Sequence, residues 1–274
     1  FFTFLGDAQN KKKISSIFHL GACSSTTETN VDFLLQNNFE YSKKTFEWCH
    51  ANEKNLIYAS SCATYGAGEK GFDDTLDSDE LRPLNPYGYS KVLFDRWMQV
   101  NGNTKNFKWC GLKFSNVFGP QEYHKGEQAS LVCKAYHQIK TNGSLQLFRS
   151  HRPDFKDGEQ KRDFIYVKDL TNWMWQIHTA FENKKAFANG VYNMGSGQAR
   201  SWLDLATAVF NVLKAPVKIE WIDIPENIRH QYQYFTQTTM GRFYENGFEK
   251  PRWSLESGIK DYVENYLAKE DAYL

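Results

Sequence analysis

Several absences limit what this chain of 274 residues can be. It has no run approaching ~18 apolar residues, so we expect no membrane-spanning helix, and Phe1–Leu5 is too short a run for a signal peptide. Charge of one sign is not in excess, because 33 basic and 32 acidic side chains leave a net charge of +1. This balance argues against nucleic acid or a membrane surface as a partner. We interpret Lys11–Lys13 as a solvated turn before a strand.

Cysteine is scarce and shows no ligand spacing. The five cysteines are odd in number, and no two of them form a C-x-x-C pair. This pattern is typical of reduced thiols in a cytoplasmic protein, and it favours neither a disulfide framework nor a zinc site. We therefore expect a cytoplasmic protein without a metal. The residues are Cys23, Cys49, Cys62, Cys110 and Cys133.

Glycine is missing where one kind of fold would need it. A doubly wound nucleotide-binding sheet usually opens with a strand, a glycine-rich phosphate turn and a helix. Only Gly6 precedes Ile14, so no G-x-x-G-x-x-G is present there. The string Gly195-Ser196-Gly197 lies late in the chain and lacks a third glycine. We interpret it as a structural turn.

What the sequence does contain is an alternation of strands and helices. Apolar runs predict strands at 14–20, 55–61 and 108–114, and helical spacing predicts helices at about 31–50 and 86–100. This order is typical of a parallel sheet with helices on both faces. In such sheets ligands bind at the carboxyl ends of the strands, which is where Ser61 falls.

The second half of the chain is less regular. We expect a helix at 128–140, a strand at 163–169 that continues into a helix, and a strand followed by a turn at 190–197. Another helix should begin after Ser201, with Asp204 in its first turn. No internal repeat or low-complexity linker is visible.

Tyr87 and Lys91 are the most informative pair. They are four residues apart on a predicted helix and therefore lie one above the other. A phenol can act as a base only if its pKa falls from about 10, and a neighbouring ammonium stabilises the phenolate. The pair predicts a proton-transfer device beside an oxidation or reduction. Because Y-x-x-x-K alone is common, this interpretation depends on the flanking segments 59–66 and 114–120.

Two strings give the chain a family resemblance. They are Gly21-Ala22-Cys23-Ser24-Ser25-Thr26-Thr27-Glu28 and His124-Lys125-Gly126, the second of which follows Gly119-Pro120. With residues 37–43, 84–91, 161–164 and 232–237, they resemble the extended short-chain dehydrogenase/reductases that act on nucleotide sugars. Within that family the chain is most similar to the branch that epimerises ADP-linked heptoses. The resemblance runs from about Ile14 to the C-terminus.

The resemblance implies a fold, a reaction and partners. The fold would be α/β, a Rossmann-like parallel sheet with a smaller α/β substrate-binding domain. About 50 residues, with the phosphate-binding glycines, would be missing from the N-terminus. The reaction would be NADP-dependent inversion at C6 of an ADP-heptose, with NAD as the alternative cofactor, in a homo-oligomer that serves lipopolysaccharide core synthesis. The dinucleotide-binding domain would comprise 1–116, 163–194 and 230–246, and the substrate domain 117–162, 195–229 and 247–274.

Catalytic roles are also implied by the resemblance. An epimerase can remove hydride from a CHOH carbon and return it to the other face, which makes two acid/base groups useful. These map onto Tyr87 and Lys125. Ser61 would hydrogen-bond the sugar oxygen, and Lys91 would contact the nicotinamide ribose and lower the pKa of Tyr87. Without the resemblance, Lys125 would be interpreted as an exposed loop lysine.

Binding roles follow from the same correspondence. Leu20, Gly21, Ala22, Cys23 and Ser24 would pass beneath the cofactor, with Asn37, Lys91, Val117 and Lys125 as further contacts. A polar helix position explains Asn37 nearly as well. Substrate contacts would come from Ser61, Asn116, Phe148, Arg149, Ser150, His151, Arg162 and Tyr232.

Arg162 is the clearest substrate candidate, because a guanidinium suits bidentate pairing with a diphosphate. The alternative interpretation of Arg162 is a surface ion pair with Asp163. Glu127 and Lys134 are also assigned to the substrate side. They stand where the family tends to have a small hydroxyl and a histidine, so the details of sugar contact stay open.

Other functions are weighed against this one. A 4,6-dehydratase needs an Asp-Glu pair where this chain has Cys62-Ala63, so dehydration is disfavoured. A UDP-hexose 4-epimerase shares the serine, tyrosine and lysine but not the two discriminating strings. A non-catalytic binding subunit would fit the missing phosphate turn, but Ser61, Tyr87, Lys91 and Lys125 oppose it. Cofactor content would separate an enzyme from a binding subunit.

Overall fold

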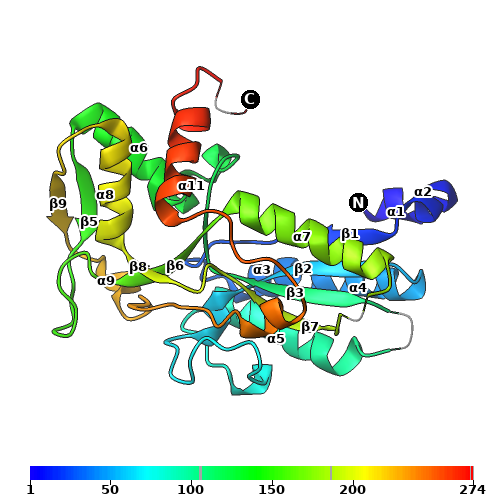
Figure 1. Ribbon diagram of the computed structural model, residues 1–274. Coiled ribbons are helices and arrows are strands. Elements are labelled where there is room, and N and C mark those ends of the chain that lie inside the picture. Colours follow the sequence, from blue (N-terminus) through cyan, green and yellow to red (C-terminus); the bar gives the residue numbers. More distant parts are fainter. Residues whose placement is uncertain (105–106, 186, 272, 274) are drawn as a thin grey trace. The chain divides into compact units, whose positions relative to one another are not determined.

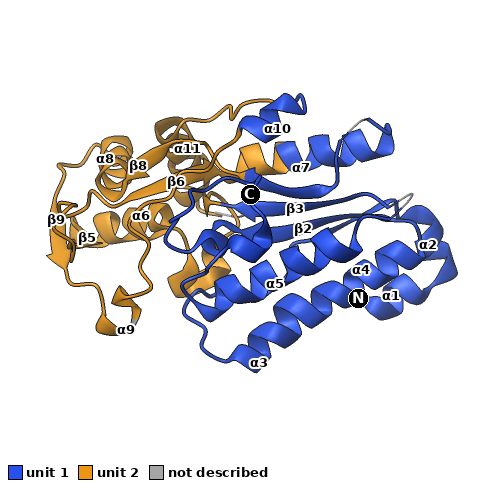
Figure 2. Cartoon of the chain, turned by 90° about the horizontal axis from the view of Figure 1, so that it is seen from below, with its two compact units in different colours: residues 1–114, 173–193, 241–248 blue, residues 115–172, 194–240, 249–274 orange. Residues whose placement is uncertain are grey.

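The computed structural model describes residues 1–104, 107–185, 187–271 and 273. The chain divides into two compact units, each assembled from three stretches of sequence (Figure 2). Unit 1 comprises Phe1–Phe114, Trp173–Asn193 and Gly241–Phe248, and unit 2 comprises Ser115–Asn172, Met194–Met240 and Glu249–Leu274. The functional assignment of the two expected domains stays a prediction.

Unit 1 is built on a parallel sheet in the order β1-β2-β3-β7. Its strands are β1 (Ser16–His19), β2 (Asn55–Ser61), β3 (Trp109–Phe114) and β7 (Gly190–Met194). The pairs β1/β2 and β2/β3 are parallel, and Ser61 lies opposite Phe114 at the carboxyl end. The apolar runs therefore predicted these strands and their direction correctly.

Helices cover both faces of this sheet. Figure 1 shows α7 (Val167–Glu182) above it and α5 (Pro86–Asn101) below it. Successive residues of a strand point to opposite faces, and Leu56 and Tyr58 of β2 pack in one apolar core with Phe46 and Phe94. The other helical segments are α1 (Phe2–Gly6), α2 (Ala8–Lys13), α3 (Val31–Leu34), η1 (Leu35–Glu40), α4 (Tyr41–Ala51), η2 (Cys62–Tyr65), η3 (Ser78–Glu80) and α10 (Gly241–Glu245).

Lys11–Lys13 lie in a helix and not in the solvated turn that was expected. They form the last turn of α2, which begins after an Asp7 side chain that accepts hydrogen bonds from Gln9 N and Asn10 N. Cations in the last turn of a helix interact favourably with its dipole. This local capping explains why a short helix forms there.

Unit 2 contains two small sheets. In the first, β4 (Asn116–Phe118) runs parallel to β6 (Lys161–Tyr166), which runs antiparallel to β8 (Ala199–Ser201). The second pairs β5 (Leu145–Phe148) with β9 (Ile219–Ile222) in parallel. The helical segments are η4 (Tyr123–Gln128), α6 (Leu131–Asn142), α8 (Trp202–Leu213), α9 (Glu226–Arg229), α11 (Leu255–Tyr262) and η5 (Val263–Leu267).

Local capping accounts for two boundaries in unit 2. Ser201 and Asp204 form a complete capping box at the start of α8, as the sequence predicted. The strand expected at 163–169 is displaced, because β6 ends at Tyr166 and Val167 already begins α7. Asp169 lies in the first turn of that helix, where an acid is favourable.

The turn at 195–197 is structural, as expected. The buried Asp163 carboxylate accepts hydrogen bonds from Ser196 N at 2.7 Å, Gly197 N at 3.1 Å and Thr238 N at 3.0 Å. The N–H groups of Ser196 and Gly197 are thus already bonded to the carboxylate of Asp163 in the same unit. Among the residues described, no helix is both long enough and apolar enough to cross a membrane.

Candidate active site

Ser61 is fixed at the carboxyl end of β2. Its Oγ accepts a hydrogen bond from Ala63 N at 3.1 Å, which begins the tight turn η2. Thr64 Oγ1 donates to the Ser61 carbonyl at 2.7 Å from the same turn. Both sides of Ser61 are therefore held by the segment that follows it.

Tyr87 lies beside Ser61 because α5 begins close to that turn. The Asn85 side chain caps the helix by accepting from Gly88 N at 2.8 Å. A Cβ at Gly88 would lie 2.8 Å from the Ala63 carbonyl oxygen, so only glycine permits this approach. The Ser61 side chain lies close enough to Tyr87 to influence the pKa of its phenol. The sequence predicted the strand that ends at Ser61 and the helix that begins at Pro86 correctly, and the fold brings the two together.

Lys91 is buried one turn further along α5. Its Nζ donates to the Ala59 carbonyl at 3.0 Å and lies 6.0 Å from the centroid of the Tyr87 ring. Burial lowers the pKa of Lys91 to about 8, although the charge of Asp95 opposes that shift. Lys91 is therefore mainly an ammonium at pH 7.

The pKa of Tyr87 corrects one expectation. Burial raises it above its usual value, and the hydrogen bond with Ser61 offsets part of that rise. A lowered pKa is therefore not found in the chain by itself, because desolvation of the phenol is the largest influence on it. The effect of Lys91 on Tyr87 stays a prediction. Tyr87 is a neutral phenol at pH 7 in this structure.

Asn38 is a structural residue that the sequence interpretation missed. Its Oδ1 accepts from Cys23 N at 2.8 Å, and its Nδ2 donates to the Cys23 carbonyl at 3.0 Å and to Ser90 Oγ at 2.9 Å. It thus connects the 20–24 segment to α5. The neighbouring Asn37, predicted as a cofactor contact, donates to the Phe33 carbonyl of its own helix at 2.8 Å. The spacing of Leu34, Asn38 and Ser42 would have placed Asn38 on the buried face.

His19 also belongs to this region. Its Nε2 lies 2.8 Å from Ser42 Oγ, and Ser42 donates to the Asn38 carbonyl at 2.6 Å. Since that hydroxyl proton is committed, His19 Nε2 carries the proton of their hydrogen bond. Burial, helped by the charge of Lys91, lowers the pKa of His19 to about 4. The imidazole is therefore neutral at pH 7.

In unit 2, Arg162 is a buried cation without a carboxylate partner among the described residues. Its Nη1 donates to the Lys161 carbonyl at 2.9 Å and its Nη2 to the Gln233 carbonyl. The guanidinium lies 5.6 Å from the Trp202 ring and 5.1 Å from the Tyr232 ring, and burial lowers its pKa. The alternative of an ion pair with Asp163 is wrong, because the Asp163 carboxylate faces the 195–197 turn.

Other predicted substrate residues have their contacts within unit 2. Phe148 meets Tyr232 edge to face, with ring centroids 6.1 Å apart. His151 N donates to Tyr234 Oη at 2.9 Å, and Ser150 N donates to Asp157 Oδ1 at 2.8 Å. Arg149 pairs with the same aspartate, at 3.4 Å between Nη1 and Oδ2.

Lys125 is exposed on η4 of unit 2, and Gly126 follows it at φ 51°. The segment is held at its base by the buried Glu122, whose carboxylate accepts from Ser130 N at 2.7 Å and from Ser130 Oγ at 2.6 Å. Lys134 Nζ donates to the Glu127 carbonyl at 2.8 Å, and both residues line a cavity of about 340 Å³.

The structure thus forms three groups of predicted site residues. Unit 1 brings Ser61, Tyr87 and Lys91 together, with the 20–24 segment held to their helix by Asn38. Unit 2 forms a cation–aromatic group around Arg162 and a loop group around Lys125. Asn116 and Val117 lie in β4, paired with Phe164 and Ile165 of β6. The roles assigned to all of these residues stay predictions.

Ligands of a Rossmann-like sheet bind beyond the carboxyl ends of its strands, which is where Ser61 lies, with Tyr87 and Lys91 on the adjacent helix. Residues 5–195 match the model of the NAD dependent epimerase/dehydratase family. A relative from Fusobacterium nucleatum is 48% identical over 97% of this chain and 81% of its own length. One from Nitratidesulfovibrio vulgaris is 47% identical over 95% of this chain and 79% of its own length. Both are named ADP-L-glycero-D-manno-heptose-6-epimerase. The chain therefore belongs to the NAD dependent epimerase/dehydratase family.

Solved structures agree with this placement. The crystal structure of the Helicobacter pylori ADP-L-glycero-D-manno-heptose-6-epimerase matches with a TM-score of 0.76 at 26% identity, over 95% of this chain and 77% of that one. The Thermus thermophilus UDP-glucose 4-epimerase in complex with NAD matches with a TM-score of 0.74 at 21% identity, over 95% and 82%. The second likeness shows the fold alone. The predicted fold class and the predicted enzyme class, an epimerase, are confirmed, and a nicotinamide cofactor agrees with the family's description.

Proposed function

We propose that this chain inverts C6 of ADP-D-glycero-D-manno-heptose to give ADP-L-glycero-D-manno-heptose by transient oxidation and reduction, with NADP as the cofactor. The observation that carries the proposal is the Ser61–Tyr87–Lys91 group in a chain that is 48% identical to a protein of that name. A cytoplasmic homo-oligomer stays the expectation from the resemblance.

The residues of unit 1 fit the nicotinamide end of a dinucleotide. The Lys91 ammonium has three donors, of which one goes to the Ala59 carbonyl, so ribose hydroxyls can take the others. Residues 21–24 of the 20–24 segment carry small side chains, and a Cβ at Gly21 would meet nothing within 4 Å. Lys91 and this segment would hold the nicotinamide riboside. When bound, the cofactor supplies a reversible acceptor of hydride.

Tyr87 and Lys125 would handle the proton. Tyr87, as phenolate, would take the proton of the C6 hydroxyl while hydride leaves C6, and Ser61 would donate to the same oxygen. After the ketone turns its other face, hydride would return to C6 while Lys125 as ammonium gives a proton to the oxygen, and both groups would then re-equilibrate with water. Burial raises the Tyr87 pKa, so the phenolate requires positive charge beside it, from Lys91 and the oxidised cofactor.

Arg162 supports a substrate that carries phosphate. A buried guanidinium without a carboxylate partner costs free energy, and its charge can be offset by the oxygens of a diphosphate. Phe148 and Tyr232 beside it would pack against the apolar faces of the nucleotide. We propose that Asn116, Glu127, Lys134, Arg149, Ser150 and His151 complete the substrate side.

The first experiment is to denature the purified chain and to identify the released small molecules by mass spectrometry. Released NADP is the expected result, and released NAD would change the cofactor but not the reaction. If no dinucleotide is released, even after soaking in excess NADP and NAD, the redox mechanism is wrong for this chain and a binding subunit is favoured. Turnover of UDP-glucose but not of ADP-heptose would instead identify the 4-epimerase alternative.

A further inference from the structure

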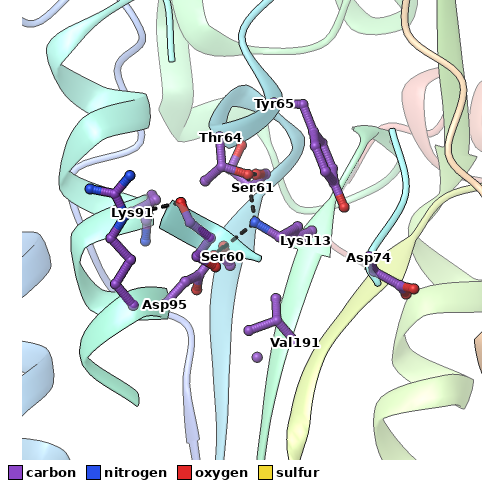
Figure 3. Close-up of polar contacts among 12 residues, drawn as sticks. Ser60, Ser61, Thr64, Tyr65, Asp74, Lys91, Asp95, Lys113 and Val191 are labelled. Carbon is purple, nitrogen blue, oxygen red and sulfur yellow. Dashed lines mark hydrogen bonds and ion pairs between the residues drawn. The ribbon is translucent and has the colours of Figure 1, made fainter. Parts of the chain in front are cut away.

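Beneath Ser61 and Lys91, unit 1 contains a buried ion pair that the proposed chemistry does not use. Lys113 Nζ lies 2.9 Å from Asp95 Oδ2, and their side chains are 3% and 0% exposed. Figure 3 shows this lysine between Thr64 and Asp95. Removing two charges from water is costly, and apolar residues of similar volume are often as stabilising. Stability alone therefore does not explain the pair.

Asp95 connects α5 to β2. It lies one turn after Lys91 on the helix, and its Oδ1 accepts from Tyr58 Oη at 3.0 Å while its Oδ2 accepts from Ser60 Oγ at 2.6 Å. The residue between these two is Ala59, whose carbonyl accepts from Lys91 Nζ. Three consecutive residues of β2, ending next to Ser61, are thus bonded to one face of α5. These bonds fix the register between the helix and the strand.

Lys113 connects β3 to the turn after Ser61. It lies opposite Ser60 in the β2/β3 register, and its Nζ donates to Thr64 Oγ1 at 2.6 Å. The Thr64 hydroxyl in turn donates to the Ser61 carbonyl at 2.7 Å. The ammonium also lies 4.9 Å from the centroid of the Tyr65 ring. One ammonium therefore holds the residues that follow Ser61 and the carboxylate that follows Lys91.

We propose that Asp95 and Lys113 are positioning residues for the reaction: their ion pair sets the distance and orientation between Ser61 on β2 and the Tyr87–Lys91 pair on α5. This inference rests on the proposed function. Positioning matters because a displacement of about 1 Å can cost about 100-fold in rate. A carboxylate and an ammonium form stronger, shorter hydrogen bonds than neutral groups do, and together they leave no net charge beside the site.

The charges around Lys91 come from several elements. Asp95 on the same helix raises the pKa of Lys91, as does Cys23, and Lys91 lowers the pKa of His19 on β1. Tyr87, whose ring centroid lies 6.0 Å from Lys91 Nζ, is a further titratable neighbour. Replacement of Asp95 therefore removes a charge that raises the pKa of Lys91. Loss of a residue that only fills space would leave that pKa unchanged, so the pKa of Lys91 distinguishes the two roles.

The activity test compares Asp95→Asn, Lys113→Met, the double variant Asp95→Leu/Lys113→Met and Lys113→Arg. We expect the single variants to lose about 10- to 100-fold in kcat with KM little changed. The double variant leaves no unpaired charge, so its thermal stability should recover while its kcat stays low. Lys113→Arg should recover part of kcat. If the double variant has the same kcat as the unmodified chain, the inference is wrong.

Lys168→Met is the matched control. It also removes the lysine of an ion pair, with Asp261 at 2.6 Å, but lies in unit 2 and has no proposed role in binding or catalysis. Its kcat should match that of the unmodified chain. If it loses as much activity as Lys113→Met, loss of any paired lysine would explain the result, and the inference would be wrong.

A second measurement needs no substrate. The pKa of Lys91 is followed by NMR in lysine-labelled protein, with Lys91→Arg to assign the signal. In Asp95→Asn we expect this pKa to fall below about 8, its value in the unmodified chain. An unchanged pKa in both Asp95→Asn and the double variant would overturn the inference. Failure of the unmodified chain to convert ADP-heptose would instead overturn the proposed function, so the two failures are distinguishable.

Discussion

In unit 1 the side chains proposed for chemistry stand on regular elements, with Tyr87 and Lys91 buried and Ser61 partly buried, whereas the second proposed acid/base group, Lys125 of unit 2, is exposed on a short turn. Tyr87 and Lys91 share one helix, and their surroundings are fixed by hydrogen bonds to β2. Around Lys125, the order comes from Glu122 at the base of the loop. The same reaction would thus draw on one pre-organised group and one group free to adjust.

This difference has a physical consequence. Burial raises the pKa of Tyr87 and lowers that of Lys91, which tunes the chemistry but makes substitutions there costly to stability. An exposed lysine on a loop can be replaced at little cost to folding. Activity and stability should therefore change together in unit 1 and separately at Lys125.

The largest effect should come from Tyr87→Phe. Removal of the phenol hydroxyl takes away an acid/base group, and we expect kcat to fall by about 10²- to 10⁴-fold. Retained NADP in the purified variant would show that the site is still formed. Near-normal epimerisation of ADP-heptose by this variant would contradict the role of Tyr87.

Lys125→Met should show the separation of activity from stability. We expect kcat to fall by about 100-fold, while the free energy of unfolding changes by less than about 0.5 kcal/mol. Urea unfolding and steady-state kinetics measure the two. Lys140→Met, an exposed lysine on α6, is the matched control. If both lysine variants keep full activity, the two-base mechanism is wrong.

Arg162→Met should act mainly on substrate binding. Loss of a charged hydrogen-bond donor is worth about 1.5–3 kcal/mol, so we expect KM for ADP-heptose to rise by about 10- to 100-fold with a smaller change in kcat. Arg162→Lys should not restore binding, because an ammonium lacks the planar fork. Unchanged KM in both variants would remove Arg162 from the diphosphate site.

The smallest effect is the pH dependence of stability from His19. Its pKa is about 4 in the folded chain and about 6.5 when unfolded. Between these values the unfolded state binds more protons, so stability is full above pH 6.5 and is lost as the pH falls towards 4. His19→Gln should flatten the melting temperature over that window, while His50→Gln, an exposed control in unit 1, should not. Equal slopes in all three proteins would contradict this account.

The sequence and the structure agree best where the signal is local. Strands 55–61 and 108–114 follow from apolar runs, and the placement of Ser61 and Tyr87 follows from the strand end and the Asn85-Pro86 helix start. The capping box at Ser201 is equally local. These features depend on neighbours within a few residues, so a single sequence contains the information.

What could not be predicted depends on contacts far apart in the chain. Asp95 has the appearance of a polar helix position and Lys113 that of an odd residue in an apolar strand, and only the fold brings them to 2.9 Å. Asn38 differs from these two, because its helical spacing from Leu34 and Ser42 is enough to indicate that it faces inward. The pKa of Tyr87 was misjudged because the depth of its burial is a property of the packed unit.

The most direct test is to incubate the chain with ADP-D-glycero-D-manno-heptose and NADP in deuterated water and to follow C6 by proton NMR. The account predicts an equilibrium mixture of the two C6 epimers with protium kept at C6, because the hydride removed is the hydride returned. Deuterium at C6, or no second epimer from a chain that holds the dinucleotide, would contradict it.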